Sequence, residues 1–173
     1  QLEGYQLSQA LVMLLEGDLQ GTARPCDIRP VDSDAAWAAF FALHQLDWSE
    51  YATRLGKSED ETVGIDMAQT HVLKSPPVRY WLAYEDGAPR GYFNAWEGLD
   101  GVGQVENLFV QAEYRHCGLA TALIHHCVAD ARAHGAGPAV IVADASDTPK
   151  RMYAAMGFRP VAVQRTYWKH VSE

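Results

Sequence analysis

One stretch of this 173-residue chain, residues 104–122, limits the folds that the chain can adopt. Two sets of side chains alternate along residues 105–110 with the period of a strand, so Glu106, Leu108 and Val110 are expected on one face. After Gly118, apolar residues recur every three to four positions, which predicts a helix. A strand, a glycine-containing loop and a helix therefore follow one another directly.

The loop before this helix has the properties of an anion site. The first turn of a helix leaves backbone N–H groups unpaired, and the positive end of the helix dipole lies behind them. Gly118 lacks a Cβ, so a ligand can approach the backbone closely. Arg115 adds a permanent positive charge at the mouth of the loop. Phosphate is the anion that such a site suits best.

The residues of this loop resemble a known signature. Arg115-His116-Cys117-Gly118-Leu119-Ala120 fits the pattern Q/R-x-x-G-x-G/A, which is similar to the acyl-CoA signature of the GNAT superfamily of N-acetyltransferases. A second block, residues 151–158, resembles the family's L-Y-x-x-x-G-F ending and follows a buried strand expected at residues 139–144. Both blocks stand in the family's order and at about its spacing. The resemblance covers roughly Asp27 to the C-terminus.

The resemblance implies a mixed α/β fold of the GNAT type, an α+β mixed sheet. An antiparallel meander would precede the strand, phosphate loop and helix, in a central splayed sheet flanked by helices. Residues 26–173 would form this acetyltransferase domain, with residues 1–25 as an N-terminal extension, an extra edge strand or the remnant of an upstream domain. The apolar run at residues 10–15 fits a strand or a short helix, and we favour a strand at a sheet edge.

Local signals predict the other elements. Asp32 and Ser33 can cap a first helix, which is expected to break at residues 47–57. Residues 58–61 form a capping box for a second helix that stops before Pro76. The remaining expectations are strands at 27–31, 78–84, 91–97 and 161–167, a hairpin turn at 85–88, a turn at 100–101 and a last helix at 148–157.

Composition restricts the partners. The net charge of −8 argues against nucleic acid, and no apolar run approaches the roughly 20 residues of a membrane span. Cys26, Cys117 and Cys127 lack zinc-type spacing, which indicates free thiols in a reducing cytosol. No metal site is expected, because the adjacent His125 and His126 splay apart on a helix. We expect a cytoplasmic monomer or homodimer without a nucleic acid or membrane partner.

The predicted activity is transfer of an acetyl group from acetyl-CoA to a primary amine, by direct attack in a ternary complex. Tyr153 matches the family tyrosine that acts as general acid toward the leaving thiolate, and Glu106 is the candidate general base. Each has a structural alternative: Tyr153 packing against the sheet, and Glu106 pairing with a cation of a neighbouring strand. The acceptor is a small-molecule or peptide amine that the sequence does not specify.

The resemblance also implies the contacts to acetyl-CoA. Backbone amides of the loop would hold the pyrophosphate, Thr121 would add a hydroxyl, and the central strand would pair with the pantetheine arm. Ser146 stands where family members often carry Asn, and its hydroxyl can either bind this arm or close a turn. The residues expected to bind acetyl-CoA are Leu108, Phe109, Val110, Arg115, His116, Cys117, Gly118, Leu119, Ala120, Thr121 and Ser146.

Two aromatic residues and two rival functions complete the prediction. Trp48 and Tyr51 are expected to line the acceptor pocket from the break between the first two helices, where aromatic rings can hold a cation.

A non-catalytic acyl-CoA-binding or regulatory module is the alternative function, since it needs the loop but neither Tyr153 nor Glu106. A doubly wound nucleotide-binding fold is disfavoured, because its glycine loop follows its first strand.

Overall fold

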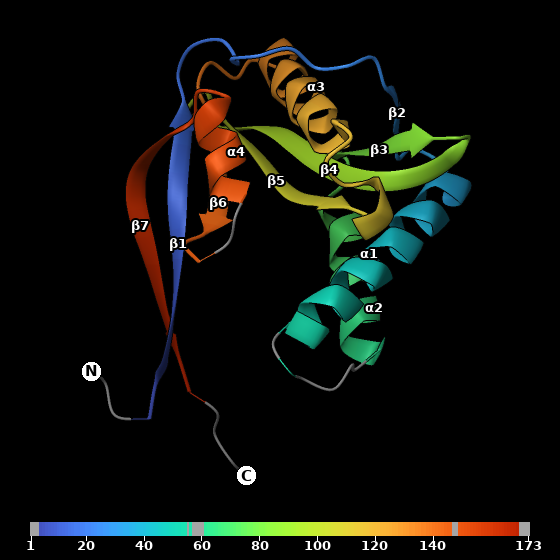
Figure 1. The fold of residues 1–173 in the computed structure, drawn as a ribbon, viewed down its shortest axis with the longest axis horizontal. Coiled ribbons are helices and arrows are strands. Elements are labelled where there is room, and N and C mark those ends of the chain that lie inside the picture. The colour runs from blue at the N-terminus through green and yellow to red at the C-terminus, as the bar shows by residue number, and fades with distance from the viewer. Residues whose placement is uncertain (1–3, 55, 57–60, 147–148, 170–173) are drawn as a thin grey trace.

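A computed structural model describes residues 4–54, 56, 61–146 and 149–169 as a mixed sheet with helices on both faces (Figure 1). The strand order is β2-β3-β4-β5-β6-β1-β7. The strands are β1 (Gln6–Leu15), β2 (Asp27–Pro30), β3 (Arg79–Glu85), β4 (Ala88–Leu99), β5 (Val102–Val110), β6 (Ala139–Asp144) and β7 (Arg159–Trp168). The helices are α1 (Asp34–Arg54), α2 (Glu61–Lys74), α3 (Leu119–Ala133) and α4 (Pro149–Ala155). The predicted mixed α/β fold is confirmed.

The centre of the sheet is splayed, as predicted. Strands β2 to β5 form an antiparallel meander, and β5 then pairs with β6 in parallel. Gly103 pairs with Ala139 and Gln104 with Val140, and no later residue of β5 has a partner on β6 within the described residues. Figure 1 shows the two strands diverging from this point. Residues 105–110 therefore lie along an opening between the two strand backbones, where β5 is no longer paired with β6.

Strand β1 forms as favoured, but its predicted position at a sheet edge is wrong. It pairs with β6 on one side, from Ala10–Asp144 to Leu15–Ala139, and with β7 on the other. Met13 and Leu15 are buried against the core on the α3 side. An apolar run becomes an interior strand only when later strands flank it, and β6 and β7 lie more than a hundred residues further along the chain.

The expected break in the first helix is also wrong. Helix α1 continues through Arg54, because residues 47–54 contain neither glycine nor proline. The Tyr92 hydroxyl donates a 2.6 Å hydrogen bond to Asp47 and thereby ties this part of α1 to the sheet. Residues 58–60 of the predicted capping box, and Thr148 before α4, lie outside the described residues. The hairpin turn at 86–87, the turn at 100–101 and the end of α2 before Pro76 are confirmed.

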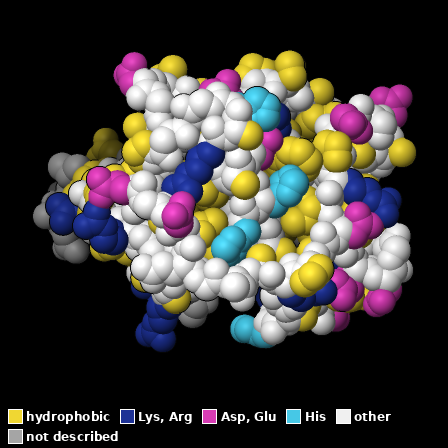
Figure 2. Space-filling view, turned by 90° about the horizontal axis from the view of Figure 1, so that it is seen from above, with side chains coloured by type: hydrophobic (Ala, Val, Ile, Leu, Met, Phe, Trp, Pro, Cys, Tyr) yellow, Lys and Arg dark blue, Asp and Glu magenta, His cyan; other side chains and the backbone are white. Residues whose placement is uncertain are grey.

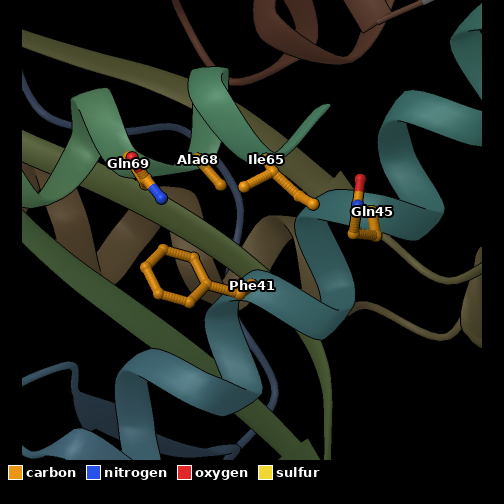
Figure 3. A pocket seen from close by; sticks show the side chains of 5 residues that line it. All are labelled: Phe41, Gln45, Ile65, Ala68 and Gln69. Carbon is orange, nitrogen blue, oxygen red and sulfur yellow. The ribbon is translucent and has the colours of Figure 1, made fainter. Parts of the chain in front are cut away.

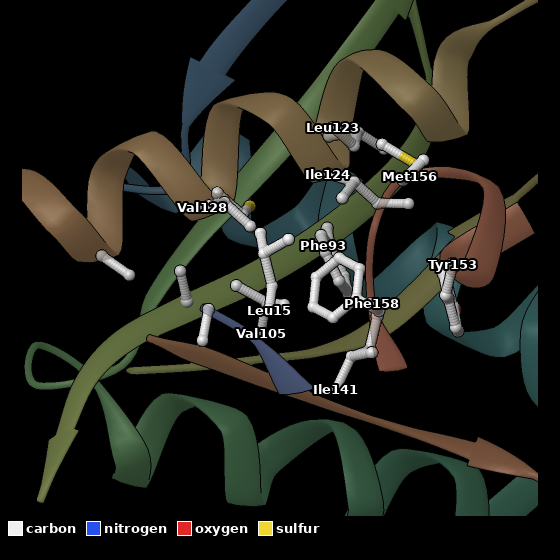
Figure 4. Packing of buried hydrophobic residues seen from close by; sticks show 14 of the residues in the cluster. Leu15, Phe93, Val105, Leu123, Ile124, Val128, Ile141, Tyr153, Met156 and Phe158 are labelled. Atoms are coloured by element: carbon white, nitrogen blue, oxygen red, sulfur yellow. The ribbon is translucent and has the colours of Figure 1, made fainter. Parts of the chain in front are cut away.

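Each face of the sheet has its own core. On one face, α3 packs Leu123, Ile124 and Val128 against β1, β4, β5 and β6 (Figure 4). Helix α4 contributes Tyr153 to the same core. On the other face, α1 packs against the meander through a second apolar cluster. None of the helices in the described part of the chain is long and apolar enough to cross a membrane.

Two buried histidines belong to the second core. The rings of His44 and His71 lie 5.2 Å apart, and His71 Nδ1 shares a 3.0 Å hydrogen bond with the Tyr80 hydroxyl. Burial lowers the pKa of His71 to about 4 and also lowers the pKa of His44. Both imidazoles are therefore neutral near pH 7, which is the form that an apolar environment favours.

This burial predicts an acid sensitivity of the fold. Below a pH of about 6.5, histidine takes up a proton in the unfolded chain but not yet in the folded one. The free energy of unfolding should fall as the pH drops from about 6.5 toward about 4, by up to about 1.4 kcal/mol per unit for His71 alone. Urea denaturation across this range measures the slope, and His71→Gln should make it shallower. An equal slope in the variant would contradict the assignment.

Candidate active site

The loop between β5 and α3, where the sequence predicts an anion site, leads directly into the first turn of α3. A 3₁₀ turn at Ala112–Tyr114 leads into residues with positive φ, 61° at His116 and 90° at Gly118. Gly118 is the N-cap residue of α3, and no side chain among the described residues makes a capping hydrogen bond there. The Cys117 thiol donates to the Tyr114 carbonyl at 2.6 Å. The backbone N–H groups of the first turn are therefore available to an anion.

The Arg115 side chain turns back from this loop. Its Nε donates to the Val110 carbonyl at 2.9 Å, and its Nη2 donates to the carboxylate of Glu50 on α1. The guanidinium is therefore paired, whereas the sequence suggested a charge directed at the mouth of the loop. This contact joins the end of β5, the loop and α1. Whether Arg115 also contacts a ligand stays a prediction.

A β-bulge in β5 changes the face on which Glu106 lies. Tyr92 pairs with Phe109 but Asn94 pairs with Glu106, so β5 carries one extra residue between these pairs. Asn107 adopts a φ of 60° at this point. Leu108 then packs on the α3 side, and Glu106 on the α1 and α2 side. The predicted shared face of Glu106 and Leu108 is wrong, because strict alternation ends at a bulge.

Three polar side chains surround the Glu106 carboxylate. Gln104 donates a 2.7 Å hydrogen bond to Oε2, and Asn94, which is fully buried, donates a 3.5 Å bond to Oε1. The Lys74 ammonium on α2 lies 4.0 Å from Oε1. The neighbouring cation thus comes from a helix instead of a strand. The carboxylate side chain is 28% exposed, which leaves it accessible to water.

Tyr153 and Ser146 lie on the other side of the opening. Tyr153 is 5% exposed, and its ring packs edge-on against Phe158 at a centroid distance of 6.2 Å (Figure 4). The Ser146 hydroxyl and backbone N–H both donate to Asp144 Oδ1, at 2.6 and 2.7 Å. These bonds lower the pKa of Asp144 and close a turn after β6. The roles of both residues toward acetyl-CoA stay predictions.

Trp48 and Tyr51 stand on α1 itself. Their rings stack at 5.8 Å, and Tyr51 is 43% exposed. Trp48 packs against α2, since a Cβ on Gly64 would lie 2.9 Å from its Cδ1. A cavity of about 120 Å³ between the same two helices is lined by Phe41, Gln45, Ile65, Ala68 and Gln69 (Figure 3). This cavity is too small for CoA, and its walls are mostly apolar.

Sequence reasoning missed two acidic residues in the C-terminal half of α1. Asp47 and Glu50 lie three positions apart on the helix, and the expected break hid that spacing. Burial raises the pKa of Asp47, which accepts the hydrogen bond of Tyr92. Among the described residues, no three histidine, cysteine or carboxylate side chains gather as metal ligands would.

Comparison with known families identifies the class of protein. The sequence profile of the Acetyltransferase (GNAT) family matches residues 37–158, so the chain belongs to this family. No curated protein sequence matches the chain. The family assignment agrees with the splayed sheet and with the loop at the start of α3.

Solved structures share the fold. A conserved protein of unknown function from Staphylococcus epidermidis matches with a TM-score of 0.72 and 16% identity, over 95% of this chain and 62% of its own. A GCN5-related N-acetyltransferase from Kribbella flavida gives 0.64 and 20%, over 95% and 59%. This chain thus spans about three fifths of the length of those two proteins. AAC(6')-Iy, solved with the bisubstrate analog CoA-S-monomethyl-acetylneamine, gives 0.60 and 19%, over 86% and 100%.

The bulge predicts a contrast between two substitutions of Asn107. Asn107→Gly and Asn107→Val both lose the 3.1 Å hydrogen bond to Asn94, but only glycine adopts a positive φ without strain. The valine variant should therefore be less stable than the glycine variant, by about 1–2 kcal/mol. Chemical denaturation of the two variants measures this difference. Equal stabilities would show that the backbone at Asn107 is not constrained.

Proposed function

We propose that this chain is an N-acetyltransferase that uses acetyl-CoA and transfers the acetyl group directly to a primary amine. One observation carries the proposal: the opening between β5 and β6 leads to the phosphate loop of α3, in a chain of the GNAT family. In this arrangement the pyrophosphate lies against the backbone amides of residues 116–120, with the Thr121 hydroxyl beside them. The pantetheine arm pairs with the backbone of residues 108–110.

The chemistry follows from this placement. The amine nitrogen attacks the thioester carbon, a C–N bond forms, and the C–S bond then breaks. A backbone N–H of β5 stabilises the oxyanion of the tetrahedral intermediate, a contribution of about 3–4 kcal/mol per donor in measured cases. Tyr153 gives its proton to the departing thiolate, so free CoA leaves as a thiol.

Glu106 takes the proton that the amine must lose. The hydrogen bonds from Gln104 and Asn94 orient its carboxylate, and the exposure of the side chain allows transfer directly or through one water. The amine approaches from the side of α1 and α2, because the bulge at Asn107 turns Glu106 to that face.

The acceptor pocket is proposed at the C-terminal half of α1. Tyr51 offers an exposed ring, and the Trp48 ring stacks on it. Asp47 and Glu50 lie within four positions of both aromatic residues along α1. Carboxylates and aromatic faces both favour a cation, so a cationic amine is the expected acceptor class.

A non-catalytic acyl-CoA-binding module is the second candidate. The burial of Tyr153 beside Phe158 favours it, since a packing role explains this position without any proton transfer. Calorimetry with acetyl-CoA, followed by a CoA-release assay over a panel of amines, separates the two functions. The enzyme should bind acetyl-CoA and release CoA with at least one amine. Tight binding without release for every amine would support the module.

The role of Tyr153 gives a specific prediction. Tyr153→Phe keeps the ring and its contact with Phe158 but removes the proton donor. The affinity for acetyl-CoA should barely change, and the chemical step should slow by about 10²-fold, the lower end of the range for a general acid, because thiolate is a fair leaving group.

Single-turnover kinetics measure this step without interference from product release. Tyr84→Phe is the matched control, because Tyr84 lies on β3 under the Arg29 guanidinium and away from the opening. The control should react at the wild-type rate. A Tyr153→Phe variant that is equally fast would leave Tyr153 as a packing residue.

A further inference from the structure

The segment between β1 and β2, residues 16–26, passes along α3 (Figure 1). Near the end of α3, the Arg132 guanidinium donates to the Gly17 carbonyl at 2.5 Å. Further along the segment, the Gln20 N–H donates to the Met156 carbonyl at 3.0 Å, beyond α4. Figure 2 shows this side of the molecule, where basic, acidic and histidine side chains are interspersed among apolar ones. The segment is therefore fixed to the fold on the same side as the phosphate loop.

Near its end, this segment places Arg24 on the N-cap residue of α3. A Cβ built on Gly118 would lie 3.3 Å from Arg24 Cδ and 3.5 Å from its Nε. The first turn of α3 contains no acidic residue, and no side chain in the described part of the chain caps it. A guanidinium beside the positive end of a helix dipole has the unfavourable sign of charge. Such a pairing of two positive groups is favourable only when an anion lies between or beside them.

The anion within the described chain is Glu85, at the end of β3. Its Oε2 accepts a 2.5 Å hydrogen bond from Arg24 Nη2, and the two side chains are 35% and 31% exposed. Arg24 Nε, by contrast, is shielded from water and has no hydrogen-bond partner among the described residues. One edge of the guanidinium is thus satisfied by Glu85, and a donor beside Gly118 is left over. An oxygen of a phosphate at the loop would satisfy this donor.

We infer that Arg24 is a ligand of the phosphate groups of acyl-CoA, and that Glu85 competes with those phosphates for its guanidinium. The inference rests on the proposed function, since it takes the loop at Gly118 as the pyrophosphate site. Arg24 lies before residue 37, where the match to the family profile begins, so the segment adds a ligand from outside the matched region. The ligand chemistry is a phosphate ester or anhydride, which an arginine binds through two donors.

The test compares three variants by calorimetry with acetyl-CoA. Arg24→Gln should weaken binding by about tenfold, the lower end for a hydrogen bond to a charged group, because the side chain is partly exposed. Glu85→Gln should tighten binding by a factor of about two to five, since it removes a competing anion. Arg29→Gln is the matched control: Arg29 lies on neighbouring β2, pairs with Asp27, and its loss changes the net charge equally.

The control should bind as the wild type does, and thermal unfolding should confirm that all three variants are folded. Acetyl-3′-dephospho-CoA then identifies the phosphate: a loss in Arg24→Gln that persists assigns the pyrophosphate, and one that disappears assigns the 3′-phosphate. Equal affinities of Arg24→Gln and Arg29→Gln would overturn the inference, as would tighter binding in Arg24→Gln. A wild-type chain that does not bind acetyl-CoA would instead overturn the proposed function.

Discussion

The divergence of β5 from β6 is the feature on which the rest of the site depends. Two residue pairs, Gly103–Ala139 and Gln104–Val140, hold the strands together at one end. Close packing fixes this end, because a Cβ on Gly103 would lie only 2.8 Å from the Cβ of Ala136 after α3. Beyond it, the backbone of β5 on the β6 side has no strand partner in the described part of the chain. Backbone donors and acceptors need partners, and an extended ligand with amide groups can supply them.

The elements around this opening are connected by a few polar contacts. Arg115 joins the end of β5 to Glu50 on α1, so the proposed phosphate loop and the proposed acceptor wall share one ion pair. Arg24 joins the same loop to Glu85 on β3. The bulge at Asn107 turns Glu106 to the side of α1 and α2, while Leu108 stays on the α3 side. The site is therefore assembled from segments that span most of the chain.

Local sequence signals predicted the parts of this structure that depend on neighbours in the chain. The loop at Gly118, the turns at 86–87 and 100–101 and the end of α2 before Pro76 each follow from backbone preferences of the residues present. The splayed sheet followed from a family resemblance, which neither periodicity nor composition would have supplied.

The errors arose where distant residues decide the outcome. The place of β1 depends on β6 and β7, and the continuity of α1 is supported by the bond from Tyr92 to Asp47. The face of Glu106 depends on one bulge, for which a single asparagine at position 107 is a weak signal. No local signal predicted the position of Arg24, because the sequence of a connecting segment does not indicate which helix the segment packs against.

The central claim is that acetyl-CoA occupies the opening between β5 and β6 and the loop at the start of α3. Titration of ¹⁵N-labelled protein with acetyl-CoA tests it most directly, by following the backbone amide resonances. The account predicts the largest shifts at residues 105–110 and 115–121. Strand β7, which lies at the far edge of the sheet, should show smaller changes. Saturable shifts confined to other parts of the chain, with residues 105–121 unaffected, would contradict it.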